Sequence, residues 1–447
     1  MTDRGDFSKI PNQPIRLQAL RVNPMTSTNR LSDFKTECLA GVTTFLAMSY
    51  IIFVNPQILS VAGMDKSAQI GATCLASALG SILVGLIAGS PIAMAPGMGL
   101  NAFFAYSLVV GDKIPWPTAL GIVFLSGLLF LILTIAGIRA KLVEAIPKSL
   151  VLAISVGIGL FITFIGLVNL GLVVKNEATL VGMGKFTPPV LIGLTGLLIM
   201  VILEIKKIKG SLLIGIFGAT LIALISGTLP LPKQILTLHI DLSPVAFQLD
   251  IIGALKGSFF GAIFTLMFMD LFDSLGTLVA CTLKAGVSEE KVYTGTINRL
   301  LGLDAAATML GALLGTSTTT AYIESGAGIE AGGRTGITAI VTGLLFLTGL
   351  FFVPLIGIVP NYATAPALII VGLFMTKEIS KINFNLMEEA FPAFIIIIMI
   401  ALSYSISTGL ALGFISFTLI KTLSGKSKEV KPAMWAIALL SILSFII

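Results

Sequence analysis

Apolar stretches long enough to cross a lipid bilayer recur along almost the whole chain. A helix needs about 20 largely apolar residues to cross a hydrocarbon core about 30 Å thick. These stretches are separated only by short charged loops, so no separate soluble domain fits between them. Hydrophobic residues make up 56% of the 447 and charged residues only 11%, whereas soluble chains are about 25% charged. The sequence therefore predicts an all-α polytopic membrane protein.

Fourteen segments of the chain are predicted to be transmembrane. Residues 1–36 are polar and basic and have no cleavable apolar core, so they are interpreted as a cytoplasmic tail. The last apolar stretch, 433–447, is short for a transmembrane helix, and its placement is left open. The predicted segments are 37–59, 68–89, 91–110, 117–137, 148–170, 189–206, 211–229, 255–282, 300–315, 317–331, 335–358, 362–376, 390–405 and 407–422.

Lys and Arg residues divide the loops between these segments into two sets. Basic residues gather in short loops on the cytoplasmic side of a membrane. With the N-terminus inside, the asymmetry supports fourteen crossings. The expected location is the cytoplasmic (inner) membrane. The outside loops hold only Lys66, Lys113, Lys175, Lys185 and Lys233. The inside loops hold Arg139, Lys141, Lys148, Lys206, Lys207, Lys209, Lys284, Lys291, Arg299, Arg334, Lys377, Lys381, Lys421, Lys426, Lys428 and Lys431.

Two pairs of short stretches match each other across the halves of the chain. IPKSLVLAISVGIGLFIT (146–163) aligns without gaps with VPNYATAPALIIVGLFMT (359–376), and the alignment places Gly159 opposite Gly372. GMGLNA (97–102) aligns with GAGIEA (326–331). Transporters are often built from two copies of one unit. Because each half would hold an odd number of segments, seven, the sequence predicts 7+7 inverted repeats.

The third and tenth segments have sequences that disfavour a continuous helix. SPIAMAPGMGLNAFFAY begins with Pro91 and contains Pro96, and a proline inside a helix breaks it. GTSTTTAYIES (315–325) is rich in β-branched residues, which favour extended backbone. At membrane depth such backbone survives only where it is buried in protein or lines a polar cavity. We expect each segment to be a short strand followed by a half-helix, with the strands meeting beside a common solute site.

Carboxylates inside the predicted segments mark the same region. Asp270 and Asp273 lie three residues apart, on neighbouring positions of one helix face. A carboxylate at the bilayer centre costs roughly 2.5–3.5 kcal/mol, so each needs a ligand, a proton or another partner, unless it only caps or bridges a broken helix. Glu324 follows the Thr-rich stretch, where it could accept N–H groups of a planar heterocycle or act as a helix cap. Glu330 is expected to pair with Arg334 or to face water.

At these residues the chain resembles a known family. Four stretches carry the resemblance: TECLAGVTTFLAMSYIIFVNPQIL (36–59), APGMGLNAFFAY (95–106), DLFDSLGTL (270–278) and TAYIESGAGIEAGGRTG (320–336). They are similar to the adenine, hypoxanthine and guanine permeases, the AzgA-like branch of the xanthine/uracil permease (nucleobase:cation symporter) superfamily. The resemblance covers nearly the whole chain after the tail. It implies seven plus seven inverted segments, purine uptake by proton symport, and a homodimer joined through gate domains.

The resemblance also implies a division into two domains like those of uracil permease. Segments 1–4 and 8–11 would form a core domain, and segments 5–7 and 12–14 a gate domain. In residue numbers, a tail (1–36) precedes the core (37–137 and 233–360), the gate (138–232 and 361–425) and a C-terminal segment whose placement is open (426–447).

Single residues of the expected site follow from the same resemblance. Glu324 matches the tenth-segment glutamate of the superfamily, and Asp273 and Thr277 replace the Glu and His of uracil and xanthine relatives. Glu324 and Asp273 are expected to bind the purine, with Asp270 or Asp273 carrying the proton. Backbone N–H groups near Met98 and Ser325 are expected to contribute. The remaining candidates each have a packing alternative: the amide of Asn101 and the rings of Phe45, Phe103 and Phe104.

Other classes of function are weighed against this one. An anion transporter of the same fold would favour a basic or neutral site, and a channel would not need broken segments or inverted halves. An enzyme would need a nucleophile, a metal cluster or an acid–base pair, but the chain has no HExxH or GxSxG motif, and its one histidine, His239, is predicted in an outside loop. Cys38, Cys74 and Cys281 are interpreted as core residues. No cofactor, metal or nucleic-acid partner is expected, and the proton gradient would supply the energy.

Overall fold

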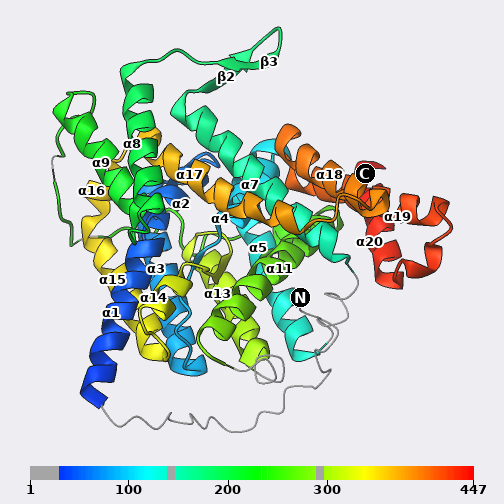
Figure 1. The fold of residues 1–447 in the computed structure, drawn as a ribbon, viewed down its shortest axis with the longest axis horizontal. Coiled ribbons are helices and arrows are strands. Elements are labelled where there is room, and N and C mark those ends of the chain that lie inside the picture. The colour runs from blue at the N-terminus through cyan, green and yellow to red at the C-terminus, as the bar shows by residue number, and fades with distance from the viewer. Residues whose placement is uncertain (1–29, 138–145, 233, 239, 288–295, 447) are drawn as a thin grey trace.

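The computed structural model describes residues 30–137, 146–232, 234–238, 240–287 and 296–446. Most of the predicted tail lies outside these ranges, and so does His239. Figure 1 shows the helices gathered side by side, with a thin hairpin projecting from them.

The elements follow in chain order. They are α1 (Arg30–Met48), α2 (Ile51–Ser60), α3 (Lys66–Leu83), η2 (Val84–Ala88), β1 (Met94–Pro96), α4 (Met98–Ala102), η3 (Phe103–Gly111), α5 (Trp116–Ile135), α7 (Lys148–Leu170), β2 (Val173–Asn176), β3 (Leu180–Met183), α8 (Pro188–Ile205), α9 (Ser211–Ile225), α10 (Ile251–Ala254), η4 (Gly257–Phe259), α11 (Phe260–Lys284), α13 (Ile297–Leu314), β4 (Thr319–Ala321), α14 (Ser325–Glu330), α15 (Gly336–Gly349), η6 (Leu350–Phe352), α16 (Val353–Gly357), α17 (Asn361–Thr376), η7 (Lys377–Lys381), α18 (Met387–Leu402), α19 (Ile406–Leu423), η8 (Ser427–Glu429) and α20 (Pro432–Ile446).

Local sequence explains where several helices begin and end. α3 begins after Asp65, whose side chain accepts a hydrogen bond from the Ala68 N–H, the usual role of an N-terminal cap. α5 carries Pro117 in its first turn, where the missing N–H has no partner within the helix to lose. α7 ends at Leu170 and is capped by Gly171, whose φ of 81° is a left-handed conformation that favours glycine.

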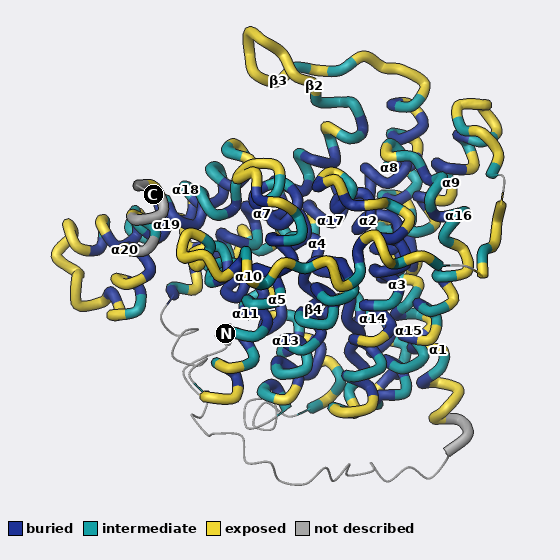
Figure 2. The backbone as a smooth tube through the Cα atoms, turned by 180° about the vertical axis from the view of Figure 1, so that it is seen from behind, coloured by how far each residue is buried: buried dark blue, intermediate teal, exposed yellow. Residues whose placement is uncertain are grey.

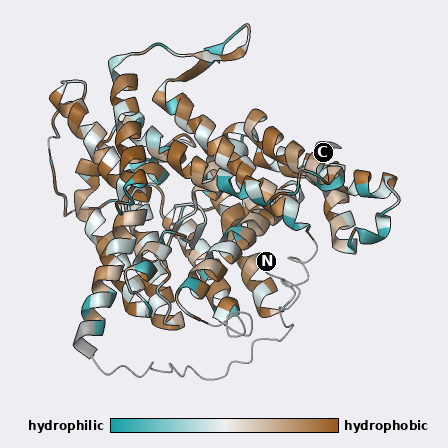
Figure 3. Cartoon of the chain, in the orientation of Figure 1, coloured by the Kyte–Doolittle hydropathy of each residue, from teal (hydrophilic) through white to brown (hydrophobic). Residues whose placement is uncertain are grey.

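Ten helical stretches in the described part of the chain are long and apolar enough to cross a membrane. Figure 3 shows hydrophobic residues along most of their length. The chain is therefore a multi-pass membrane protein. Four of the fourteen segments predicted from the sequence correspond instead to shorter elements, namely β1 with α4 and η3, α9, β4 with α14, and α18.

The long helices pack into two groups. In the first group, α1 contacts α14 and α15, α3 contacts α2, α13 and α15, and α5 contacts α11 and α13. In the second group, α7 contacts α17 and α18, α8 contacts α9 and α17, and α18 contacts α19. The aligned glycines of the sequence match, Gly159 and Gly372, lie where α7 crosses α17, and a Cβ on Gly159 would lie 2.8 Å from the Gly372 carbonyl oxygen. The crossing therefore requires glycine.

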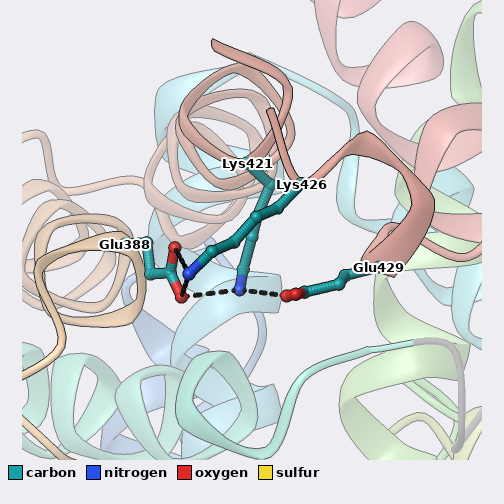
Figure 4. Close-up of polar contacts among 4 residues, drawn as sticks. All are labelled: Glu388, Lys421, Lys426 and Glu429. Atoms are coloured by element: carbon teal, nitrogen blue, oxygen red, sulfur yellow. Dashed lines mark hydrogen bonds and ion pairs between the residues drawn. The ribbon is translucent and has the colours of Figure 1, made fainter. Parts of the chain in front are cut away.

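Two features of the fold were not predicted from the sequence. Between α7 and α8, β2 pairs antiparallel with β3 in a hairpin, which Figure 2 shows as largely exposed. The C-terminal stretch whose placement was open forms α20, which packs against α19 and α11. Ion pairs fix the turn before it, because Lys421 Nζ lies 3.0 Å from Glu388 Oε1 and 2.7 Å from Glu429 Oε2 (Figure 4).

Candidate functional site

The broken segments meet as a two-stranded antiparallel sheet. β1 pairs with β4 so that Met94 lies opposite Ala321 and Pro96 lies opposite Thr319. All residues of both strands are buried. The Tyr322 hydroxyl donates to the Pro96 carbonyl oxygen at 2.6 Å and locks the two segments together. The predicted strand pair is therefore present, at the proline and threonine stretches from which it was expected.

A short helix follows each strand. α4 begins at Met98, directly after Gly97, and the chain then continues into η3. α14 begins at Ser325, with Glu324 at the cap position. The Glu324 side chain caps no backbone N–H of α14, so the interpretation of this residue as a simple helix cap is wrong.

A cavity of about 470 Å³ lies between the two groups of helices. It is called the central cavity below. From the first group it is lined by Tyr50, residues 97–100, Phe268, Met269, Phe272, Asp273, Gly276, Thr277, Ala280 and residues 320–324. From the second group it is lined by Val151, Leu152, Ile154, Ser155, Ile158, Val371, Phe374, Met375, Glu378 and Lys381. Its wall is thus mainly apolar and aromatic, with a few polar groups, as is typical of small-molecule sites.

Besides Glu378, which pairs with Lys381 at 2.8 Å, two carboxylates reach this cavity from different elements. Asp273 lies on α11 and is exposed to the cavity. Glu324 is half-buried, and its Oε1 accepts a hydrogen bond of 2.6 Å from the Tyr50 hydroxyl. No ion pair to Lys, Arg or His is formed by either side chain within the described ranges. Both are therefore placed to accept hydrogen bonds from a small polar ligand.

A third intramembrane acid, Asp304 of α13, supports the strand beside the cavity. Asp304 is fully buried and accepts hydrogen bonds from the Ser274 hydroxyl at 2.5 Å and from the Ala321 N–H at 3.0 Å. The Ser274 hydroxyl also lies 2.5 Å from that of Thr320. Asp304 thus ties α11, α13 and β4 together. The sequence analysis missed it, although a carboxylate in the predicted segment 300–315 was a signal.

Two predicted site residues are buried beside the cavity rather than in its wall. Asp270 is 1% exposed and accepts a hydrogen bond of 2.9 Å from the Thr308 hydroxyl. Asn101 is fully buried, and its amide donates to the Asn55 side chain at 2.5 Å. Asn101 therefore packs the broken segment. It also differs from its sequence match Glu330, which is exposed.

Ser325 and Phe45 also lie outside the cavity wall. The Ser325 N–H donates to the Tyr322 carbonyl oxygen at 3.1 Å, and its hydroxyl accepts from the Ala93 N–H at 3.0 Å. Both groups are thus engaged in holding the turn. Phe45 packs edge-on against Phe346, with ring centroids 5.1 Å apart. Of the predicted site residues, Met98, Asp273 and Glu324 line the cavity.

Aromatic residues in the wall were not predicted. Phe268 and Phe272 lie on the same side of α11 as Asp273, and their ring centroids are 4.6 Å apart. Their spacing of four residues was a signal, since residues four apart on a helix share a face. Tyr50 reaches the cavity from the N-terminal cap position of α2, and Tyr322 reaches it from the turn after β4. Phe103 and Phe104, by contrast, are fully buried.

The chain is similar to known permeases. Residues 35–412 match the family described as the Permease family, that of xanthine and uracil permeases. The guanine/hypoxanthine permease PbuG of Bacillus subtilis (strain 168) is 44% identical, with 93% of this chain and 97% of the relative covered. The adenine permease AdeP of Escherichia coli (strain K12) is 43% identical, with 92% of this chain and 93% of the relative covered.

Solved structures show the same fold at much lower identity. The transmembrane domain of the cyanobacterial bicarbonate transporter BicA superposes with a TM-score of 0.62 at 15% identity, covering 87% of this chain and 98% of that one. Such a likeness bears on the fold alone. The family is shown by the match over residues 35–412 and by the two permeases that are more than 40% identical. The chain belongs to the xanthine/uracil permease family, in its AzgA-like branch of adenine, guanine and hypoxanthine permeases.

Proposed function

We propose that this permease imports purine nucleobases, either adenine or hypoxanthine and guanine, by proton symport through alternating access. One observation carries the proposal: Glu324 and Asp273 both reach a cavity between the two groups of helices. Relatives more than 40% identical over most of the chain are named as adenine and guanine/hypoxanthine permeases.

The chemistry of the central cavity suits a purine. Each of these bases carries N–H donors in the plane of its ring, and the carboxylates of Glu324 and Asp273 are acceptors. The half-buried ring of Phe272 offers an apolar face for stacking, and Met98 lines the cavity where α4 begins. A volume of about 470 Å³ also lies within the range of about 300–1,000 Å³ for small-molecule sites.

The fold proposal is fourteen segments in two inverted sets of seven. The first group of helices would be the core domain and the second group the gate domain, since these groups contain the same segments as the predicted domains. The contact of Gly159 with Gly372 and the pairing of β1 with β4 support the repeat, because matching positions of inverted repeats meet at their common axis. With the N-terminus in the cytoplasm, Glu378 and Lys381 would line the cavity from its cytoplasmic side.

Proton coupling is assigned to Asp270 or Asp273. Neither makes an ion pair with a basic side chain in the described part of the chain, and a charged carboxylate within a membrane is costly. A bound proton would remove that cost in one step of the cycle. Asp273 is the stronger choice because it faces the cavity, whereas Asp270 is 1% exposed and bonded to Thr308. A homodimer through the gate domains and a location in the inner membrane complete the proposal.

A second function for this fold is anion transport. The carboxylates of Glu324 and Asp273 would repel an anion, so the acidity of the cavity favours a neutral base. A channel is also disfavoured. Glu324 and Asp273 line one cavity and make a site for one ligand, whereas a channel would need a row of equivalent sites.

The test is uptake of radiolabelled adenine, hypoxanthine, guanine and uracil into proteoliposomes, with and without an inward proton gradient. Saturable, gradient-driven uptake of a purine is expected for the wild type and not for Glu324→Gln or Asp273→Asn. Glu177→Gln is the control, since Glu177 lies exposed in the β2–β3 hairpin. If the folded, correctly oriented wild type takes up none of the bases, the purine assignment fails and anions should be tried.

A further inference from the structure

Tyr50 lies where the first segment breaks between α1 and α2. α1 ends at Met48 and α2 begins at Ile51, with Tyr50 at the cap position of α2. The residue is 1% exposed, so its ring belongs to the core, yet it lines the central cavity. A tyrosine with a buried ring and a polar tip at a cavity usually uses its hydroxyl to bind a partner.

That partner is Glu324. The Tyr50 hydroxyl donates to Glu324 Oε1 at 2.6 Å across 274 positions of sequence. This length is typical of an O–H donor bound to a carboxylate, which is about twice as strong as a bond between neutral groups. No other side chain in the described part of the chain donates a hydrogen bond to Glu324. The carboxylate also accepts a hydrogen bond from its own backbone N–H, so Tyr50 is the partner that reaches it from another element.

The second tyrosine of the cavity has a different role. The Tyr322 hydroxyl donates to the Pro96 carbonyl oxygen, so it holds β1 and β4 rather than the carboxylate. Glu324 follows the β4 turn and its side chain makes no helix-cap bond. Its orientation therefore depends on Tyr50 alone among the described side chains.

We infer that Tyr50 is a positioning residue for nucleobase binding: its hydroxyl fixes the Glu324 carboxylate in the orientation that meets a ring N–H of the base. This inference rests on the proposed function. It adds to the proposed site a residue of the first segment, 274 positions before Glu324 in the sequence. Without the hydroxyl, the carboxylate could rotate, and ordering it would reduce the free energy of binding.

The test is equilibrium binding of radiolabelled purine to purified protein, for wild type and Tyr50→Phe. Phenylalanine keeps the ring and removes only the hydroxyl. We expect the Kd to rise by about five- to tenfold, because binding must then order the carboxylate that the hydroxyl had held. The Tm without ligand should change little. Tyr362→Phe is the control, because the Tyr362 hydroxyl has no hydrogen-bond partner in the described part of the chain, and its Kd should stay within about twofold.

A double-mutant cycle tells a positioning role from a general one. Glu324→Asp keeps the carboxylate but withdraws it from Tyr50 by one methylene, so it should already have lost the hydrogen bond. Adding Tyr50→Phe to Glu324→Asp is then expected to change the Kd by less than about twofold. Equal Kd values for wild type and Tyr50→Phe, or full additivity in the cycle, would overturn the inference. A Tyr50→Phe protein that does not fold would also overturn it, because the hydroxyl would then support the fold. Absence of purine binding by the wild type would instead refute the proposed function.

Discussion

Lys209 Nζ lies 2.7 Å from Glu330 Oε2, although 121 positions separate the two residues. Lys209 belongs to the turn between α8 and α9 in the second group of helices, and Glu330 ends α14 in the first. Lys284, at the end of α11, binds the other carboxylate oxygen at 2.6 Å. Of the two expectations for Glu330, pairing with Arg334 is wrong, because the Arg334 guanidinium donates to the Ile329 carbonyl oxygen at 2.5 Å. Exposure to water is confirmed, since the Glu330 side chain is 50% exposed. An ion pair thus joins the two groups.

Loss of this ion pair should have a small effect on stability. Both side chains are about half exposed, at 46% and 50%, and exposed pairs contribute about 1 kcal/mol or less. Lys209→Ala is therefore expected to lower the Tm by at most about 3 °C, and by less in high salt, which screens the charges. Thermal unfolding in detergent at two salt concentrations measures this. Lys206→Ala in the same turn is the control, and a loss that high salt does not reduce would show that Lys209 acts through packing.

Lys421 and Lys426 bind the same carboxylate from different depths. Both contact Glu388, but the Lys421 side chain is 7% exposed and that of Lys426 45% exposed (Figure 4). Lys421 also bridges to Glu429, so its loss leaves two carboxylates near each other. Lys421→Met is expected to lower the Tm by about 3–5 °C, and Lys426→Met by about 1 °C. Thermal unfolding compares the two, and equal losses would mean that burial of Lys421 contributes nothing.

The buried acid of α13 should matter more than any of these lysines. Asp304 accepts from the Ser274 hydroxyl and the Ala321 N–H. Asp304→Ala would leave the Ala321 N–H buried without an acceptor and the Ser274 hydroxyl with only that of Thr320, at a cost of about 2–5 kcal/mol. Asp304→Asn keeps one carbonyl oxygen, so it should lose less than half as much. Thermal unfolding of both variants tests this, and an Ala variant as stable as the Asn variant would show that water replaces the carboxylate.

The broken segments could be predicted because their chemistry is local. Pro96 cannot donate to a helix, and Thr319 and Thr320 favour extended backbone, so each stretch carries its own signal. The strands that pair in the structure are formed by these residues. Met98 and Glu324 lie two and three residues after the ends of β1 and β4, so their place in the cavity wall could also be expected from the sequence.

The rest of the site depends on contacts between distant parts of the chain. No local pattern indicates that the hydroxyl of Tyr50 binds Glu324, since 274 positions separate them. The sequence also does not indicate that Phe45 packs against Phe346. Composition alone does not tell which face of an all-apolar helix contacts protein and which contacts lipid. Asp270 illustrates the same limit. It is three residues from Asp273, yet it is buried beside Thr308 rather than in the cavity.

Close packing of α1 against α14 leaves no room for a side chain at Gly328. A Cβ there would lie 2.5 Å from the Ala40 carbonyl oxygen and would also contact the Thr44 hydroxyl. Gly328→Ala is therefore expected to destabilise the protein by about 1–3 kcal/mol. Gly261→Ala on α11 is the control, since its Cβ would have no neighbour within 4 Å, and alanine favours the helix. Thermal unfolding measures both, and equal Tm values would show that α14 can move away from α1.

Gly276 offers a way to fill the central cavity without disturbing the fold. It lies on the cavity face of α11, one turn after Phe272, and a Cβ there would have no neighbour within 4 Å. Gly276→Leu should fold with an unchanged or higher Tm, because leucine favours the helix. Its side chain would occupy the space beside Asp273 that a base needs, so the Kd for purine should rise by more than about tenfold. Gly302→Leu on α13 is the matched control, since its Cβ would also be free of neighbours and it does not line the cavity. Purine binding that survives Gly276→Leu but not Glu324→Gln would place the base against Tyr50 and away from α11, and Asp273 would then be left with the proton alone.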